Sequence, residues 1–163
     1  MRYRRFAAMI TVSTAIMYLL MYLNTYTWSD VWFSQTRLWM ALIMGSVMTF
    51  VMMVFMWSMY ENRAVNAVIL MGATLLFCAA LVLVRSQSTV GDISFMKAMI
   101  PHHSIAILTS SRAEITDPRV RDLADRIIEA QVKEIGEMER LIGDLRENPP
   151  TSNHRLDPAA FEH

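Results

Sequence analysis

The sequence predicts an all-α protein in which three transmembrane helices are followed by an antiparallel helical hairpin. The 163-residue chain is 54% hydrophobic, and three long stretches, 6–29, 38–60 and 64–84, contain no charged residue. Beyond residue 88 charged residues are frequent, and apolar residues recur every three or four positions, as on one face of a helix. The formal net charge of zero is the sum of +4 over residues 1–88 (six basic, two acidic) and −4 over residues 89–163 (nine basic, thirteen acidic).

The first half, 1–88, is predicted to be a membrane domain. A helix of about 20 apolar residues spans the hydrocarbon core, so we expect spans at about 6–23, 38–59 and 65–84. The first span follows a basic start and has no small-residue cleavage site after it, which favours an uncleaved anchor. Because basic residues beside a span stay in the cytoplasm, we expect a bacterial inner-membrane protein with a cytoplasmic N-terminus and a periplasmic hairpin.

Methionines follow one face of the second span. They recur at every fourth residue, at Met40, Met44, Met48, Met52 and Met56. Residues four apart stack on one helix face, so the stripe is either a thioether track for Cu(I) or Ag(I), or a row of adaptable packing residues. No His or Asp interrupts it as a stronger ligand, which favours packing.

The single cysteine, Cys78, lies in the third predicted span. One cysteine excludes a disulfide framework within the chain and a cysteine-based zinc finger. A thiol in an apolar helix is usually inert packing, so nucleophilic catalysis lacks support.

The hairpin is predicted over residues 89–147. Its first helix begins near Asp92 and contains Pro101, which predicts a kink because proline removes one backbone hydrogen bond. Asp117 suits the N-cap of the second helix and Pro118 its first turn, and the helix ends before residue 148. Residues 148–163 are predicted to be a flexible tail.

Sulfur and polar residues gather on the inner faces of the two hairpin helices. A turn centred near residue 116 or 117 sets Met99 opposite Glu134, His102 opposite Gln131, and Met96 opposite Met138. The candidate ligands are Met96, Met99, His102, His103 and Met138, with Glu134 as an oxygen ligand or as a partner of a histidine. Thioethers and imidazoles suit Cu(I) or Ag(I) best and Cu(II) next, whereas zinc prefers thiolate. The alternative is a core of polar residues that satisfy one another across the hairpin, with methionine as filler.

Two segments resemble a known family. They are the run from Asp92 to His103, which contains Met-Ile-Pro-His-His, and the run from Gln131 to Met138. Together they resemble the domain-of-unknown-function-305 family. The resemblance implies a ferritin-like helical fold outside the cytoplasm and, in some members, copper binding; it adds Asp92 and Gln131 as motif residues without an assigned role. Two departures are Ser104, where a larger polar or acidic residue is common, and Ser110, where methionine often occurs.

A single hairpin shows its apolar face to only one partner, so we expect it to complete a four-helix bundle as a homodimer or higher oligomer. The leading prediction is a membrane-anchored copper or silver protein for sequestration, sensing or hand-over, working with an envelope copper-handling partner. The alternatives are an adaptor whose hairpin contacts an envelope component without metal, and a metal channel that uses the methionine stripe. We expect no enzyme activity, since Glu-x-x-His repeats of a diiron oxidase are missing, and no nucleic-acid binding by the acidic half.

Overall fold

Helices are the only regular secondary structure over residues 3–149, which a computed structural model describes, so the all-α prediction is confirmed for this part of the chain. The predicted tail, 148–163, lies outside the described residues except for its first two. Five α-helices follow one another along the chain: α1 (Tyr3–Leu20), α2 (Gln35–Phe55), α3 (Arg63–Ser86), α4 (Asp92–Arg112) and α5 (Pro118–Glu147). Short 3₁₀ turns lie at Trp28–Asp30 (η1) and Trp57–Met59 (η2).

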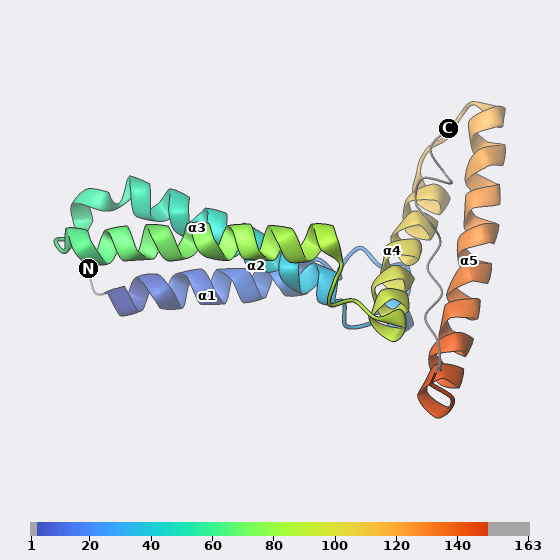
Figure 1. Ribbon diagram of the computed structural model, residues 1–163. Helices are drawn as coiled ribbons and strands as arrows, with labels where there is room; N and C mark the ends of the chain where they lie inside the picture. Colours follow the sequence, from blue (N-terminus) through green and yellow to red (C-terminus); the bar gives the residue numbers. More distant parts are fainter. Residues whose placement is uncertain (1–2, 150–163) are drawn as a thin grey trace, which may run out of the picture.

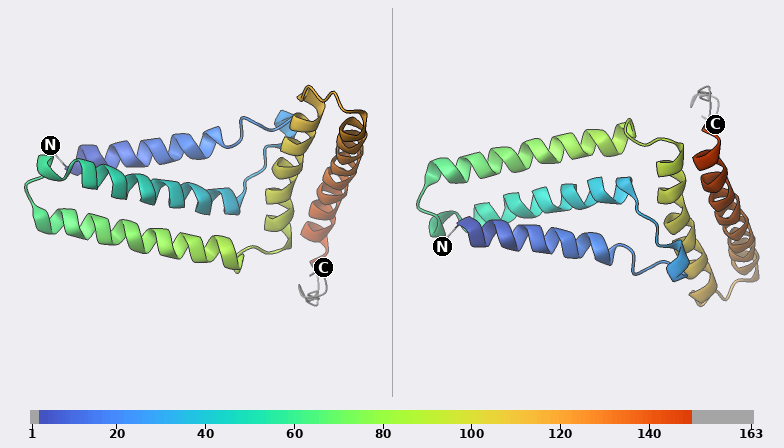
Figure 2. Two further views of the ribbon diagram at one scale, coloured as in Figure 1. Left: turned by 90° about the horizontal axis from the view of Figure 1, so that it is seen from above. Right: turned by 90° about the horizontal axis from the view of Figure 1, so that it is seen from below.

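The helices form two units that lie across one another (Figure 1). Helices α1, α2 and α3 form a three-helix bundle, in which α2 packs against both of the other helices. Helices α4 and α5 form an antiparallel hairpin at one end of this bundle (Figure 1). Seen from above and from below, α4 lies between the bundle and α5, so α5 is on the outer side (Figure 2).

Side-chain caps and one close contact position the bundle helices. The Ser34 side chain accepts a hydrogen bond from the backbone of Arg37 and caps α2, and Asn62 caps α3 in the same way. In the middle of α2, Gly45 lies so close to α1 that a Cβ atom there would come within 2.5 Å of the Thr14 hydroxyl. Glycine at this position therefore permits the close approach of α1 and α2.

Two of the bundle helices, α2 and α3, are long and apolar enough to cross a membrane. Only 22% and 11% of their most apolar segments are buried within the protein, which is unlike the core helix of a soluble domain. Helix α1, whose 18 residues begin at Tyr3 and include Arg4 and Arg5, is not among these helices. Residues 3–149 therefore show two candidate spans rather than the predicted three, and the first helix runs from 3 to 20 rather than from 6 to 23.

The methionine stripe of α2 divides into a packed part and a more exposed part. Met53 is fully buried in a cluster with Phe6 and Tyr60, and Met52 and Met56 pack against that cluster. Met40, at the other end of the helix, is 38% exposed. Met52 and Met56 of the stripe, together with Met53 beside it, therefore contribute to helix packing.

The hairpin has a small core shared by its two helices. Met96, Ile100 and Ile142 are buried there, and Trp32 from the loop between α1 and α2 packs against them. The predicted cap is confirmed: the Asp117 side chain accepts a hydrogen bond from the backbone of Arg119 at the start of α5. The guanidinium of Arg119 also bonds this carboxylate and holds the pKa of Asp117 below its usual range.

The register of the hairpin differs from the prediction by about one helical turn. Glu134 contacts His103, four residues beyond the predicted partner Met99. The connection between the helices is extended at both Ala113 and Asp117, rather than a tight turn. It therefore carries the chain past the end of α4 before α5 begins (Figure 1).

A buried polar contact fixes the hairpin to the bundle. The Ser104 hydroxyl donates to the Asp30 carboxylate over 2.5 Å and accepts from the backbone N–H of Tyr26 over 2.7 Å. Ser104 is fully buried and Asp30 is 8% exposed. A buried carboxylate without such a partner is costly, so this contact anchors α4 to the loop between α1 and α2.

Candidate functional site

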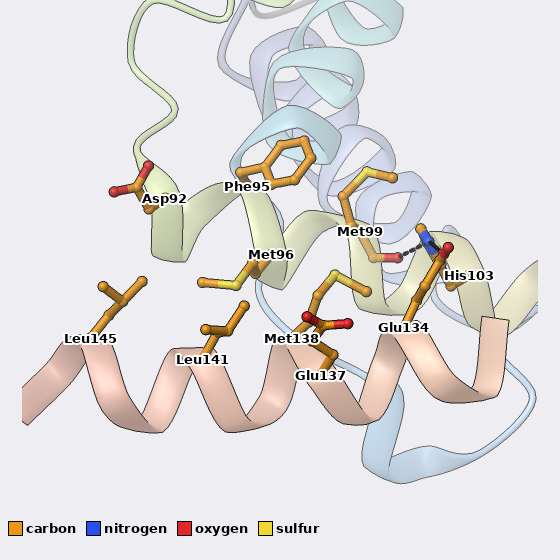
Figure 3. A pocket seen from close by; sticks show the side chains of 10 residues that line it. All are labelled: Asp92, Phe95, Met96, Met99, His103, Glu134, Glu137, Met138, Leu141 and Leu145. Atoms are coloured by element: carbon orange, nitrogen blue, oxygen red, sulfur yellow. Dashed lines mark hydrogen bonds and ion pairs between the residues drawn. The ribbon is translucent and has the colours of Figure 1, made fainter. Parts of the chain in front are cut away.

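The candidate site is an open cavity of about 440 Å³ between α4 and α5, which we call the hairpin cavity. Five of the eight residues singled out from the sequence as ligands or motif residues line its central part, and Asp92 lies at one end (Figure 3). The full lining consists of Asp92, Phe95, Met96, Met99, His103, Glu134, Glu137, Met138, Leu141 and Leu145. The cavity thus brings together sulfur, imidazole and carboxylate groups from two helices.

His103 is held from both sides of its ring. Its Nδ1 lies 2.9 Å from the Met99 carbonyl oxygen, one turn earlier in α4, and its Nε2 lies 2.7 Å from Glu134 Oε2 on α5. Both partners accept hydrogen bonds, so the ring donates to both only as an imidazolium. In the neutral ring, an N–H at Nδ1 keeps the bond to Met99 and leaves the Nε2 lone pair facing the Glu134 carboxylate. Metal-binding histidines in proteins usually donate one ring N–H to a backbone carbonyl or a carboxylate, and the other ring nitrogen binds the ion.

The methionines of the cavity differ in direction. Met96 and Met138 lie in the space between α4 and α5, whereas the Met99 side chain points away from α5 (Figure 3). Met96 is 7% exposed, and Met138 packs against the same small core. Both methionines therefore belong to the core between α4 and α5, while their direct pairing stays a prediction. Met99 lines the cavity, but its contact with His103 is made by its backbone carbonyl, which lies next to Nδ1 of the ring.

Besides sulfur, the cavity is lined by one imidazole, His103, and by the carboxylates of Asp92, Glu134 and Glu137. No group of three or more His, Cys, Asp or Glu side chains that could hold a metal occurs among residues 3–149. Zinc and diiron sites use such groups. The cavity instead combines thioethers and one imidazole, which suit a soft ion such as Cu(I) or Ag(I), with three carboxylates, of which Glu134 faces the imidazole.

His102 lies apart from this site. It is exposed and lines a second cavity of about 410 Å³ between α4 and the three-helix bundle, which we call the junction cavity. The rings of His102 and His103 are 6.2 Å apart, centre to centre, and adjacent residues of a helix point about 100° apart. The predicted contact of His102 with Gln131 is therefore wrong. Gln131 is half-buried and lines neither cavity.

Three positions in and around the site were not predicted. Glu137 lines the hairpin cavity one turn after Glu134, and this spacing was the available signal. Ser104 anchors α4 through Asp30, and its departure from the family pattern was the signal there. A larger or acidic side chain at residue 104 would meet the buried Asp30 carboxylate, which explains why a small hydroxyl suits this chain.

Comparison with known proteins agrees with the similarity of the hairpin to a family. A segment of 65 residues is 37% identical to an uncharacterized protein of Acanthamoeba polyphaga mimivirus. This match covers 39% of the present chain and 43% of the viral protein, less than half of each. No solved structure matches the chain. The part of the chain that begins at helix α4, residues 92–161, matches the family described as Domain of unknown function (DUF305).

Proposed function

We propose that the protein binds a soft metal ion, Cu(I) or Ag(I), in the hairpin cavity and anchors this site to a membrane through α2 and α3. The observation that carries the proposal is that Met96, Met138 and His103 line one cavity, where the Met99 carbonyl fixes Nδ1 of His103. Thioether and imidazole are the neutral ligands that Cu(I) favours. Cu(II) would rely more on Glu134 and His103.

The paired His103 and Glu134 explain how the same cavity can exist with and without metal. In the absence of metal, a His103 ring with a proton on Nε2 donates to Glu134, whose own side chain is 51% exposed. An ion bound at Nε2 would displace this hydrogen bond, and the freed carboxylate would face a positive charge at close range. Glu134 would then act as a further ligand or as a counter-charge. The metal is cargo for sequestration, sensing or hand-over, and no reaction is required.

Membrane placement and self-association complete the proposal. The exposed apolar surface of α2 and α3 suits lipid, and we place the hairpin on the periplasmic side of a bacterial inner membrane, with the N-terminus in the cytoplasm. The hairpin cavity is open on one side, and α5 exposes several large apolar side chains: Val120, Leu123, Val132 and Leu141. A second hairpin packed there would cover the cavity and form a ferritin-like four-helix bundle.

A second candidate function is an adaptor that binds no metal. One observation favours it: both nitrogens of His103 already have partners in the protein, so the ring is satisfied without an ion. In this case the hairpin would contact an envelope component through the exposed face of α5, and the methionines would serve as packing residues.

Adjacent histidines provide a matched test of the two functions. The full-length protein in detergent is titrated anaerobically with Cu(I) in competition with a chelator, as wild type, His103→Ala and His102→Ala. Losing one ligand of a site typically costs tenfold or more in affinity, so we expect at least about a tenfold loss for His103→Ala and less than about twofold for His102→Ala. Equal effects of the two substitutions, or no binding by the wild type, would contradict metal binding in the hairpin cavity and favour the adaptor.

A further inference from the structure

The junction cavity has the opposite charge character to the hairpin cavity. Its lining comes from the start of α2, the end of α3 and the face of α4 that points away from α5. The residues are Ser34, Thr36, Arg37, Gln87, Val90, Phe95, Ala98, Met99 and His102. None of them is acidic, and Arg37 contributes a permanent positive charge. A cation is therefore disfavoured in this cavity, although it shares Phe95 and Met99 with the hairpin cavity.

The charge of Arg37 lacks a counter-ion within the part of the chain that the structure describes. One guanidinium nitrogen donates to the Met21 carbonyl over 2.7 Å, and the group lies 4.4 Å above the Tyr22 ring. These contacts hold the half-buried side chain in place, but neither supplies a negative charge. Arg37 forms no ion pair with any carboxylate of residues 3–149. A partly buried cation is normally balanced by an anion, which indicates that the cavity takes one.

The other lining residues indicate which anion fits. Thr36 and Gln87 add polar side chains, while Val90, Phe95, Ala98 and Met99 form an apolar wall. The cavity lies where the two candidate membrane helices meet the hairpin, the depth at which phospholipid headgroups are found. A free anion would gain nothing from contact with the apolar wall, whereas a lipid would place its glycerol and upper acyl chains along it. We propose that the junction cavity binds the phosphate group of an anionic phospholipid, with Arg37 as the charged contact.

This inference rests on the membrane placement proposed above but not on metal binding. A bound lipid would fill the space between the bundle and α4, on the same side of α4 as the Ser104–Asp30 contact. It would thus help to fix the hairpin relative to the membrane. Because the hairpin cavity is on the other side of α4, loss of lipid binding would leave Cu(I) affinity unchanged, and loss of Cu(I) binding would leave lipid binding unchanged.

Lipid retention by the full-length protein tests the proposal. Native mass spectrometry in mild detergent would measure binding of phosphatidylglycerol and of phosphatidylcholine to wild type, Arg37→Gln and Arg85→Gln. Arg85 is an exposed arginine near the same end of the bundle and does not line the cavity. Its substitution therefore controls for nonspecific attraction of anionic lipid to a positive charge. Hydrogen bonds to a charged group are worth about 1.5–3 kcal/mol, which converts to at least a tenfold loss of phosphatidylglycerol affinity for Arg37→Gln. We expect less than about twofold for Arg85→Gln.

A second variant covers the case in which Arg37→Gln disturbs folding. Ala98→Leu fills the cavity from α4 and leaves Arg37 in place, so it should also lower phosphatidylglycerol retention about tenfold. Equal losses for Arg37→Gln and Arg85→Gln, or full retention by Ala98→Leu, would overturn the proposal. So would an equal rise in melting temperature with millimolar inorganic phosphate and with phosphatidylglycerol, because the cavity would then be a site for a free anion.

Discussion

The hairpin cavity and the junction cavity lie on opposite sides of α4 and share two residues of this helix, Phe95 and Met99. The hairpin cavity adds Glu134, Glu137 and thioethers from α4 and α5, whereas the junction cavity adds Arg37 and the exposed His102. The difference shows that neighbouring residues in a sequence motif can serve different sites, because adjacent positions on a helix diverge by about 100°. Two predictions test how independent the two sites are, and a third tests the cap of α5, away from both.

The largest effect is expected from Ser104→Asp. The substitution introduces a second carboxylate beside the buried Asp30 and should destabilise the contact between α4 and the bundle by about 3 kcal/mol or more. Limited proteolysis and thermal unfolding would detect the released hairpin. Phospholipid retention in the junction cavity should be lost, whereas Cu(I) binding in the hairpin cavity should persist.

The matched control is Ser111→Asp, which changes an exposed serine of the same helix. The free energy of unfolding should stay within about 0.5 kcal/mol of the wild-type value, as is usual for surface substitutions. Limited proteolysis should likewise resemble that of the wild type. If Ser104→Asp abolished Cu(I) binding as well, the two cavities would not be independent.

An intermediate effect is expected from leucine substitutions of the methionines, which keep the side-chain volume and remove the sulfur. Met138 lies between α4 and α5, whereas the Met99 side chain points away from α5. Met138→Leu should therefore weaken Cu(I) binding about tenfold, and Met99→Leu about threefold. Competition titration measures both, with Met71→Leu on the exposed side of α3 as the control. A larger loss for Met99→Leu than for Met138→Leu would place the metal nearer the junction cavity.

The smallest effect concerns pH and the cap of α5, which lies away from both cavities. Arg119 lowers the pKa of Asp117, so the folded state favours the ionised carboxylate more than the unfolded state does. The stabilisation is fully present above the ordinary aspartate pKa of about 3.9 and is lost as the pH falls through the lowered value. Asp117→Asn should reduce the stability of the hairpin at pH 6 and weaken its dependence on acid. Circular dichroism melts between pH 2 and pH 6 would measure this. An unchanged acid dependence would show that Asp117 adds nothing measurable.

Several features of the fold could be predicted from local sequence. The uncharged stretches located the bundle helices to within a few residues, and Asp117 with Pro118 gave the start of α5. Both depend on neighbours in sequence, namely hydropathy over one helix and a cap at its end. The membrane assignment of α1 differed, since only α2 and α3 are long and apolar enough to cross a membrane.

The candidate site could be predicted in part. The helical spacing brought Met96, Met99, His103, Glu134 and Met138 to one cavity, as expected from the faces they share. Glu134 does partner a histidine, as predicted, but it lies opposite His103 instead of Met99, because the register of two antiparallel helices depends on where the second begins. An extended connection moved this start by about one turn, and the propensities of its residues do not reveal such a shift.

The sequence by itself determined that residues 3–149 are built from helices, that an apolar half precedes a charged half, and that sulfur, imidazole and carboxylate groups gather between the hairpin helices. Only the tertiary structure decided that His103 faces α5 while His102 faces away from it, and that Ser104 anchors α4 to Asp30. The physical reason is the separation in sequence between the residues that interact. Hydropathy and capping act within one helix, whereas these contacts join residues 31 and 74 positions apart, and their partners are fixed only when the hairpin packs against the bundle.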